Sequence, residues 1–483
     1  MINLFEHLSY NPEKPLLFNS GEFLYFFILF LSLFLILKKQ RFLRNLWTVT
    51  FSIFFYYKCS GLYFFILLFS TVVDYYLGFA IFNAKNQRSK RFFLILSLVS
   101  NLGILAYFKY FNFFVDTINS LGGSLNTLDI FLPIGISFYT FQTLSYSIDV
   151  YRGNLKPEKS ILNFAFFVSF FPQLVAGPIV RAKEFLPQLR HKLQLTQADL
   201  GKAVFLIANG LFKKAVISDY ISSNFVDRVF ENPALYSGFE NVLGVYGYAL
   251  QIYCDFSGYS DMAIGLALLL GFRLPDNFNY PYQSSSITEF WRRWHISLSS
   301  WLKDYLYISL GGNRKGNIRT YVNLMITMLL GGLWHGANWK FVLWGAMHGA
   351  MLALEKFIQR FVKFPKTKLM KVLGVIFTFH FVCFCWIFFR ADSYTKALEM
   401  ITQITNNFDT TIIIQVFESY RYIVFLILLG FLIHFKPKHI DIAYQKLITK
   451  SPLVVKAFYV ALICWITVQL SNSEVIPFIY FQF

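Results

Sequence analysis

Residues 23–37 read FLYFFILFLSLFLIL, and the seven residues that follow them, KKQRFLR, contain four positive charges. An uninterrupted apolar run of this kind is typical of a membrane-spanning helix, and positive charges directly after it are typical of a cytoplasmic end. No small-residue cleavage site precedes the basic cluster, so we interpret the run as a first membrane helix rather than as a cleaved signal.

The rest of the chain has the same character. Its 483 residues are 56% hydrophobic, 20% aromatic and only 14% charged, whereas about 25% of the residues of a soluble domain are charged. This composition excludes an ordinary soluble enzyme, and the many aromatic residues exclude a disordered chain. The apolar runs are long and continuous, which excludes an outer-membrane barrel of short alternating strands.

A spanning helix needs roughly 20 mostly apolar residues, and the stretches that reach or approach this length predict an all-α polytopic membrane protein with about eleven spans. The predicted spans are 16–37, 59–82, 92–115, 130–148, 161–180, 242–272, 321–339, 341–354, 372–389, 422–434 and 457–470. Residues 48–57 are apolar but too short alone, so we expect them to pair with a neighbour or to lie re-entrant. No internal repeat or linker is visible, and we predict a single integral-membrane domain, 1–483.

The formal net charge of +18 comes from basic clusters that lie between the apolar runs. Clusters at 38–44, 85–91, 152–159 and 181–192 predict the cytoplasmic side and contact with anionic membrane lipid. Arginine-rich motifs interleaved with base-stacking aromatics are absent, so we predict no nucleic-acid binding. The five cysteines lie mostly in apolar runs without a ligand set, and we expect neither a disulfide framework nor a metal site.

Residues 279–319 are less apolar but rich in tryptophan. Ser286 and Glu289 have the spacing of a capping box, which predicts a helix that begins near Ile287. On a continuous helix, one apolar face is formed by Trp291, Trp294, Leu298, Trp301 and Tyr305. A basic stripe on the other face is formed by Arg292, His295, Ser299 and Lys303. Such a helix suits the wall of a wet cavity or, as a simple amphipathic helix, the membrane interface.

His335 lies in a stretch, 320–339, that contains no Asp, Glu, Lys or Arg. An ionisable group at membrane depth is costly and usually faces a cavity, a partner or a substrate. The nearby glycines allow a backbone or a substrate to approach closely. Histidine accepts a proton near neutral pH, which is what activation of a hydroxyl nucleophile requires. The alternative is a buried histidine that is bonded to a neighbouring carbonyl, and position alone leaves both open.

Other polar residues in apolar segments favour structural roles. His348 and His380 lack a comparable context. Asp255 and Asp261 either orient a helix break or line a cavity, but their spacing on a helix does not support a carboxylate pair. The glycine-rich basic loop 311–316 either receives the phosphates of a nucleotide-containing donor or is a plain cytoplasmic loop, and it lacks the spacing of a nucleotide hydrolase.

Three segments resemble the bacterial membrane-bound O-acyltransferase family. They are WRRWHISLS at 291–299, YLYISLGGNR at 305–314 and GGLWHG at 331–336. LPIGISF at 132–138, FPQLVAGPI at 171–179 and YCDFSGYSD at 253–261 are also similar to that family. The motifs run from about 132 to 349 and resemble the alginate and peptidoglycan O-acetylation branch most, with the teichoic-acid D-alanyl exporter as a more distant relative.

The resemblance implies a ring of membrane helices around a central tunnel, with re-entrant or interfacial helices. His335 then matches the catalytic histidine and His295 the second signature histidine, which would orient the donor or the base or stabilise the oxyanion. Further donor or tunnel candidates are Arg292, Asn338, Asp255 and Arg314. The implied co-substrate is acetyl-CoA, which enters from the cytoplasm, and no bound cofactor or metal is expected.

The chain ends IPFIYFQF at 476–483, which resembles the C-terminal tyrosine motif of a small acyl-relay protein in the teichoic-acid system. The resemblance suggests that Tyr480 accepts the acyl group as an ester and passes it to an extracytoplasmic serine-esterase-like subunit. The alternative is an ordinary interfacial aromatic anchor.

The sequence therefore predicts an O-acetyltransferase in the bacterial cytoplasmic (inner) membrane that serves a cell-envelope polysaccharide. A second enzymatic interpretation is D-alanyl transfer for teichoic acid, which requires an acyl-carrier protein at the cytoplasmic face. A non-enzymatic interpretation is a transporter or flippase with His335 in a proton relay. Transporters often show inverted repeats, and none is visible.

Overall fold

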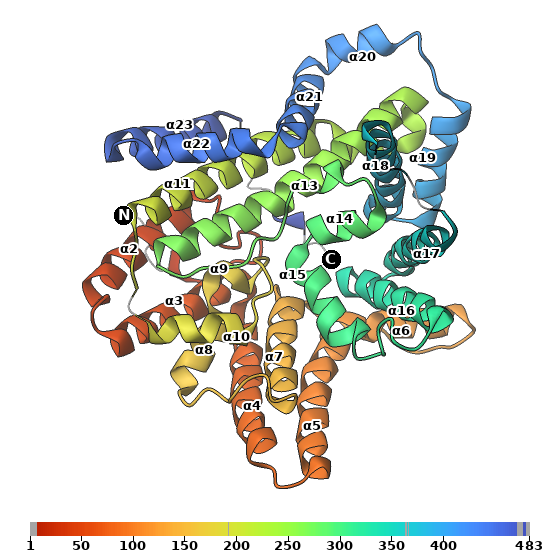
Figure 1. Ribbon diagram of the computed structural model, residues 1–483. Helices are drawn as coiled ribbons and strands as arrows, with labels where there is room; N and C mark the ends of the chain where they lie inside the picture. Colours follow the sequence, from red (N-terminus) through yellow and green to blue (C-terminus); the bar gives the residue numbers. More distant parts are fainter. Residues whose placement is uncertain (1–6, 192, 363–364, 366, 471–476, 480–483) are drawn as a thin grey trace. The chain divides into compact units, whose positions relative to one another are not determined.

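The computed structural model describes residues 7–191, 193–362, 365, 367–470 and 477–479. All regular secondary structure in these residues is helical, which confirms the predicted all-α class. The described helices are coloured along the chain in Figure 1. Contacts divide the chain into two compact units, of which the first runs to Ala203 and includes Met262–Pro275, and the second contains Val204–Asp261 and Asp276–Ile479.

The first unit contains the N-terminal helices. They are α2 (Gly21–Leu37), α3 (Arg41–Ser60), η1 (Gly61–Tyr63), α4 (Phe64–Asn83), α5 (Gln87–Leu105), η2 (Ala106–Tyr110), α6 (Phe111–Ser120), α7 (Ile136–Tyr151), α8 (Ile161–Ser169), α9 (Phe171–Leu174), α10 (Ala182–Phe185) and η3 (Leu186–Arg190). Helix α11 (Gln197–Leu211) begins in this unit and ends in the second.

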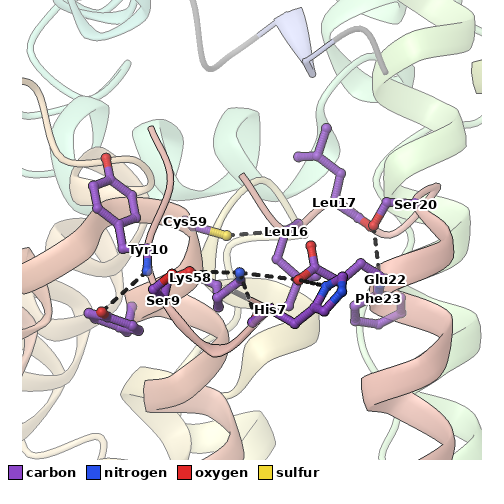
Figure 2. A network of polar contacts seen from close by, with 11 residues as sticks. His7, Ser9, Tyr10, Leu16, Leu17, Ser20, Glu22, Phe23, Lys58 and Cys59 are labelled. Carbon is purple, nitrogen blue, oxygen red and sulfur yellow. Dashed lines mark hydrogen bonds and ion pairs between the residues drawn. The ribbon is translucent and has the colours of Figure 1, made fainter. Parts of the chain in front are cut away.

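A buried lysine attaches the N-terminal segment to this unit. The Lys58 ammonium on α3 donates to the carbonyl oxygens of His7 (2.9 Å) and Ser9 (2.8 Å), and it lies 3.2 Å from the Glu22 carboxylate on α2. Figure 2 shows these contacts together. Because a buried ammonium is costly without partners, the three oxygens explain how Lys58 is accommodated in an otherwise apolar region.

A buried carboxylate links three neighbouring helices of the first unit. Asp74 on α4 accepts hydrogen bonds from Ser97 (2.5 Å) and Asn101 (2.6 Å) on α5 and from Ser147 (3.0 Å) on α7. These helices lie side by side in Figure 1. Interhelical hydrogen bonds of this kind stabilise helix pairs in an apolar environment, so Asp74 has a structural explanation.

The second unit contains the remaining helices. They are η4 (Phe212–Asp219), η5 (Ser222–Val226), α12 (Asp227–Glu231), η6 (Pro233–Leu235), α13 (Gly238–Leu269, which ends in the first unit), η7 (Pro281–Gln283), α14 (Ile287–Arg293), α15 (Ile296–Trp301), η8 (Leu302–Tyr307), α16 (Asn317–His335), α17 (Trp339–Phe361), α18 (Lys368–Arg390), α19 (Tyr394–Asn406), α20 (Ile413–Ser419), α21 (Arg421–Phe435), α22 (Lys438–Lys450) and α23 (Leu453–Leu470).

The number of about eleven predicted spans is not confirmed. Within the described residues, four helical segments are long and apolar enough to cross a membrane: Arg41–Asn83, Gln87–Ser120, α17 and α18. The bent pair α20 and α21, with 92° between its helices, makes a fifth if it is counted as one span. The ring arrangement stays a prediction.

Two predicted spans are interrupted for local reasons. In 161–180, α8 ends at Ser169 because Phe170 is extended (φ −54°, ψ 110°), and the short α9 follows with a proline in its first turn. In 130–148, α7 begins only at Ile136, after Gly135 in the left-handed region (φ 77°). Residues 48–57 lie inside the 20-residue helix α3, which together with its neighbour α4 makes up the helical segment Arg41–Asn83.

Helices α16 and α17 form a tightly packed hairpin, and they lie side by side in Figure 1. A Cβ atom at Gly332 would lie 2.2 Å from the carbonyl oxygen of Phe341, and one at Gly345 would lie 2.3 Å from the carbonyl oxygen of Met328. Small residues allow helix backbones to approach closely. These two glycines therefore set the distance between the helix that ends at His335 and its partner.

Candidate active site

The tryptophan-rich segment begins as the sequence predicts. Ser286 caps α14 by accepting a hydrogen bond from the Glu289 amide (3.1 Å). The Glu289 carboxylate reaches back to the Ser285 amide (2.8 Å) and not to that of Ser286, a small variation on the capping box. The predicted start of this helix is confirmed.

The prediction of one continuous helix through this segment is wrong. Helix α14 ends at Arg293, Trp294 is extended, and His295 adopts the left-handed conformation (φ 42°, ψ 56°) before α15 begins at Ile296. The break is stabilised by the preceding loop, because the Ile296 amide donates to the carbonyl oxygen of Asn277 (2.9 Å). A left-handed residue other than glycine is uncommon and costs energy, so the surrounding structure has to hold it there.

Asn277 also orients the His295 ring. Its side-chain oxygen accepts hydrogen bonds from the Ser297 amide (3.3 Å) and hydroxyl (2.9 Å), and it lies 3.1 Å from Nδ1 of His295. Because this oxygen is an acceptor, Nδ1 of His295 carries the proton and Nε2 carries the lone pair. Burial, with a smaller contribution from nearby His335, lowers the pKa of His295 well below its usual value of 6.5. His295 is therefore neutral at physiological pH.

The break separates His295 from the predicted basic stripe. The predicted apolar face is mostly buried, as Trp294, Leu298, Trp301 and Tyr305 are at most 7% exposed. Arg292, Ser299 and Lys303 line a cavity together with His335. His295 is fully buried and does not line that cavity, because the left-handed turn directs it elsewhere.

His335 is the last residue of α16, and only 3% of it is exposed. Its ring packs against three aromatic rings, those of Trp334 (5.1 Å between centroids), Trp344 (5.1 Å) and Phe389 (5.4 Å). Trp334 also contacts the His295 ring, at 5.9 Å. The rings of His295 and His335 therefore both contact the Trp334 indole.

The cavity that His335 lines has a volume of about 730 Å³, which is in the usual range for small-molecule and cofactor sites. Its charged walls are all cationic: Arg292, Lys303, Arg314 and Lys356. No Asp or Glu occurs among the described residues that line it, and none of the four cations forms an ion pair with a described carboxylate. Gly311, Gly312 and Asn313 of the glycine-rich loop complete the wall.

Two predicted tunnel candidates do not line this cavity. Asn338 is exposed and caps α17, where its side-chain oxygen accepts a hydrogen bond from the Lys340 amide (3.0 Å). Asp255 is buried and pairs with Lys214 at 2.7 Å. Asp261 pairs separately with Lys213 at 2.7 Å, so the two aspartates do not form a carboxylate pair. Tyr480 lies outside the described residues.

The other histidines have local partners. His348 accepts a hydrogen bond at Nδ1 from the Trp291 indole (3.3 Å) and does not line the cavity. His380 lies 2.9 Å from the Tyr246 hydroxyl. Among the described residues, no group of three His, Cys, Asp or Glu side chains is arranged to hold a metal ion.

Sequence reasoning missed the face that α17 contributes to the cavity. Trp344, Leu352, Lys356 and Gln359 line the cavity from this helix. Their separations of eight, four and three residues fit one face of an α-helix, and a single lysine and glutamine on that face are the signal that would have identified it.

Comparisons with known proteins identify the family of this chain. The sequence model of the membrane-bound O-acyltransferase family matches residues 158–392. The probable alginate O-acetylase AlgI of Azotobacter vinelandii is 45% identical over 395 residues, which cover 80% of this chain and 77% of the relative. The chain belongs to the membrane-bound O-acyltransferase family.

Two further relatives in this family differ in the substrates that their names state. The peptidoglycan O-acetyltransferase of Helicobacter pylori is 38% identical over 417 residues, with 80% of this chain and 79% of the relative covered. The teichoic acid D-alanyltransferase of Bacillus subtilis is 29% identical over 276 residues, with 54% and 69% covered. The protein is therefore an O-acyltransferase, and its apolar helices make it a multi-pass membrane protein.

Proposed function

We propose that this enzyme transfers acetyl groups from acetyl-CoA, which enters from the cytoplasm, toward a cell-envelope polysaccharide. Relatives that cover about four fifths of the chain are named for the O-acetylation of alginate and of peptidoglycan, and both of these polymers carry sugar hydroxyls. Such a reaction places the protein in the cytoplasmic (inner) membrane of a bacterium, with the donor on one side and the acceptor on the other.

The observation that carries this proposal is the cationic cavity that His335 lines. Coenzyme A carries its negative charge on phosphates at one end and its thioester at the other. Arg292, Lys303, Arg314 and Lys356 supply positive charge, and no carboxylate lines the cavity among the residues that the structure describes. Arg and Lys bind phosphate well. A phosphate end held by these cations directs the thioester toward the buried histidine.

His335 would act as the general base for the acceptor hydroxyl. It removes the hydroxyl proton as the oxygen attacks the thioester carbonyl carbon, and the new C–O ester bond forms as the C–S bond breaks. The proton then passes from His335 to the departing CoA thiolate, which leaves as the free thiol, so that atoms and charge balance. The aromatic rings around His335 exclude water, which would otherwise hydrolyse the thioester.

His295 would orient the acceptor rather than stabilise an oxyanion. As a neutral ring protonated at Nδ1, it offers a lone pair at Nε2 and has no second N–H to donate. Nε2 can accept a hydrogen bond from a hydroxyl group, but its lone pair would repel a negatively charged oxygen.

The first acceptor would be the hydroxyl of Tyr480. A phenol has a pKa near 10, so it needs a base at neutral pH, and its ester is a good acyl donor for a further transfer. The next acceptor would be an extracytoplasmic serine-esterase-like subunit, which delivers the acetyl group to the polysaccharide.

The test is mass spectrometry of the purified protein after incubation with isotope-labelled acetyl-CoA. Wild type is compared with His335→Ala, Tyr480→Phe and, as a matched control, His380→Gln, since His380 is an exposed histidine of the same unit that does not line the cavity. The expected result is label on the C-terminal peptide of wild type and His380→Gln, with none on the other two variants.

Other results would contradict specific parts of the proposal. Label on the C-terminal peptide of His335→Ala rules out this histidine as the essential base. Label that remains on Tyr480→Phe at another residue rules out the tyrosine relay. Labelling only from a carrier-bound D-alanyl thioester replaces acetyl-CoA with the donor of the D-alanyl alternative. Substrate-dependent transport that survives His335→Ala, without any acyl transfer, favours a transporter.

A further inference from the structure

Asp255 on α13 uses both of its carboxylate oxygens in the interior of the second unit. Oδ1 lies 2.7 Å from the Lys214 ammonium on η4, and Oδ2 accepts a hydrogen bond of 3.0 Å from the backbone amide of Ile479. Asp255 and Lys214 are at most 3% exposed. A carboxylate that far from water needs such partners, and one of them belongs to the C-terminal segment, 224 residues further along the chain.

The C-terminal segment is buried at this point. Phe478 is 1% exposed and Ile479 is 5% exposed. The Phe478 ring packs against the rings of Tyr259 (4.7 Å) and Phe256 (5.6 Å), which lie in the turn of α13 that follows Asp255. In the described residues 477–479, the ring of Phe478 and the backbone amide of Ile479 therefore both hold the segment against α13.

The same turn of α13 reaches the signature histidines. Phe256 packs edge-on against the His295 ring at 4.6 Å, and His295 contacts Trp334, which contacts His335. Phe478, Phe256, His295 and Trp334 thus form a continuous series of ring contacts. The residue that follows Ile479 is Tyr480.

Lys214 and its neighbour Lys213 have different carboxylate partners. Lys214 also binds Asp219 at 2.6 Å, so one ammonium is shared by two carboxylates. Lys213, the next residue, is engaged by Asp261 at 2.7 Å. Lys214 contacts Oδ1 of Asp255, so the buried Oδ2 atom needs a hydrogen-bond donor of its own, and the Ile479 amide is such a donor.

We infer that Asp255 is a positioning residue that clamps the C-terminal segment through the Ile479 amide, with Lys214 holding its carboxylate in place. The clamp holds the segment one residue before Tyr480, beside the ring series that leads to His335. The importance of this position for catalysis rests on the proposed function, whereas the clamp itself concerns only the docking of the segment.

The backbone contact allows a sharp test in the full-length protein. Ile479→Pro removes the amide hydrogen, and Ile479→Val keeps it with a similar side chain. Asp255→Asn removes the charge that binds Lys214 and Ile479, and Asp261→Asn removes a matched charge on the same helix that does not touch the segment. Hydrogen exchange of the peptide 470–483 reports docking, and labelled acetyl-CoA reports acetylation of the same peptide.

We expect Asp255→Asn and Ile479→Pro to accelerate exchange of this peptide about ten- to a hundredfold, the range expected for the loss of a hydrogen bond to a charged group. Acetylation of the peptide should fall in parallel. Asp261→Asn and Ile479→Val should match wild type in both measurements.

The other outcomes are equally clear. Wild-type exchange in Asp255→Asn and Ile479→Pro overturns the clamp. Equal acceleration in Asp255→Asn and Asp261→Asn also overturns it, because a general loosening of the ion pairs then explains the effect. Faster exchange confined to the clamp variants, with acetyl transfer unchanged, supports the clamp and contradicts the tyrosine relay, so the two proposals fail separately.

Discussion

The close approach of α16 and α17 makes Gly332→Ala an informative substitution. The new Cβ would lie 2.2 Å from the Phe341 carbonyl oxygen, whereas an ordinary van der Waals contact of a Cβ atom is 3.4 Å or longer. The helices must therefore separate locally by roughly 1 Å. Backbone atoms cannot rotate away as a flexible side chain can, so the cost should be that of an overpacked core, about 1–3 kcal/mol.

The same displacement should affect catalysis more than stability. His335 lies three residues after Gly332, less than one turn along α16. A misplacement of about 1 Å at a catalytic group can reduce a rate about a hundredfold. We therefore expect Gly332→Ala to fold, to unfold a few degrees below wild type and to lose most of its acetyl transfer.

The assay is thermal unfolding in parallel with labelled acetyl transfer, with Gly103→Ala as the control. Gly103 also lies in an apolar helix, α5, but a Cβ there meets no atom within 4 Å. Gly103→Ala should be at least as stable as wild type, since alanine is the better helix former. Wild-type stability and activity in Gly332→Ala would refute the reasoning, because the hairpin would then have room that the structure does not show.

Three further substitutions test the site. Lys356→Gln should raise the KM for acetyl-CoA roughly fivefold, as expected for one lost phosphate contact of about 1 kcal/mol. The KM for an acetyl-pantetheine thioester, which lacks those phosphates, should stay unchanged. Equal effects on both donors would contradict phosphate binding by Lys356. His295→Gln should remove part of the acid sensitivity of stability. The pKa of His295 in the folded protein lies well below 6.5, so the unfolded chain binds an extra proton as the pH falls below 6.5. The free energy of unfolding of wild type should therefore fall by up to about 2 kcal/mol between pH 7 and pH 5 because of this group. Identical pH profiles of unfolding for wild type and His295→Gln would contradict a neutral ring. Asn338→Ala should lower the free energy of unfolding by about 1 kcal/mol because the cap of α17 is lost, and Asn338→Asp should restore it. A changed KM for acetyl-CoA in Asn338→Ala would contradict this purely structural role and indicate donor binding.

The all-helical class and the start of α14 could be predicted because each rests on local chemistry. Long apolar runs need helical hydrogen bonding in lipid, and Ser286 with Glu289 satisfies free amides at a helix start. The number of spans could not be obtained in the same way. Composition does not reveal where an apolar run bends, and Phe170 and Gly135 interrupt runs that look continuous in hydropathy.

The cavity at His335 was partly predictable. Arg292, Lys303, Arg314 and His335 line it as the motifs suggest. His295 could not be placed, because its left-handed turn depends on hydrogen bonds to Asn277, which no helical periodicity records. Asp255 was recognised as unusual in its apolar surroundings, but its partners Lys214 and Ile479 come from distant parts of the chain.

The two histidines occupy chemically different surroundings, which fits a division of labour between them. His335 lines a cavity with four cations, and this side suits an anionic thioester donor. His295 is separated from that cavity and contacts Phe256, which packs against the buried C-terminal segment. Trp334 lies in contact with both imidazoles and therefore connects the cavity at His335 with the surroundings of His295. In the proposed reaction, the apolar rings around the two imidazoles would limit the access of water to a thioester and a hydroxyl that meet at His335.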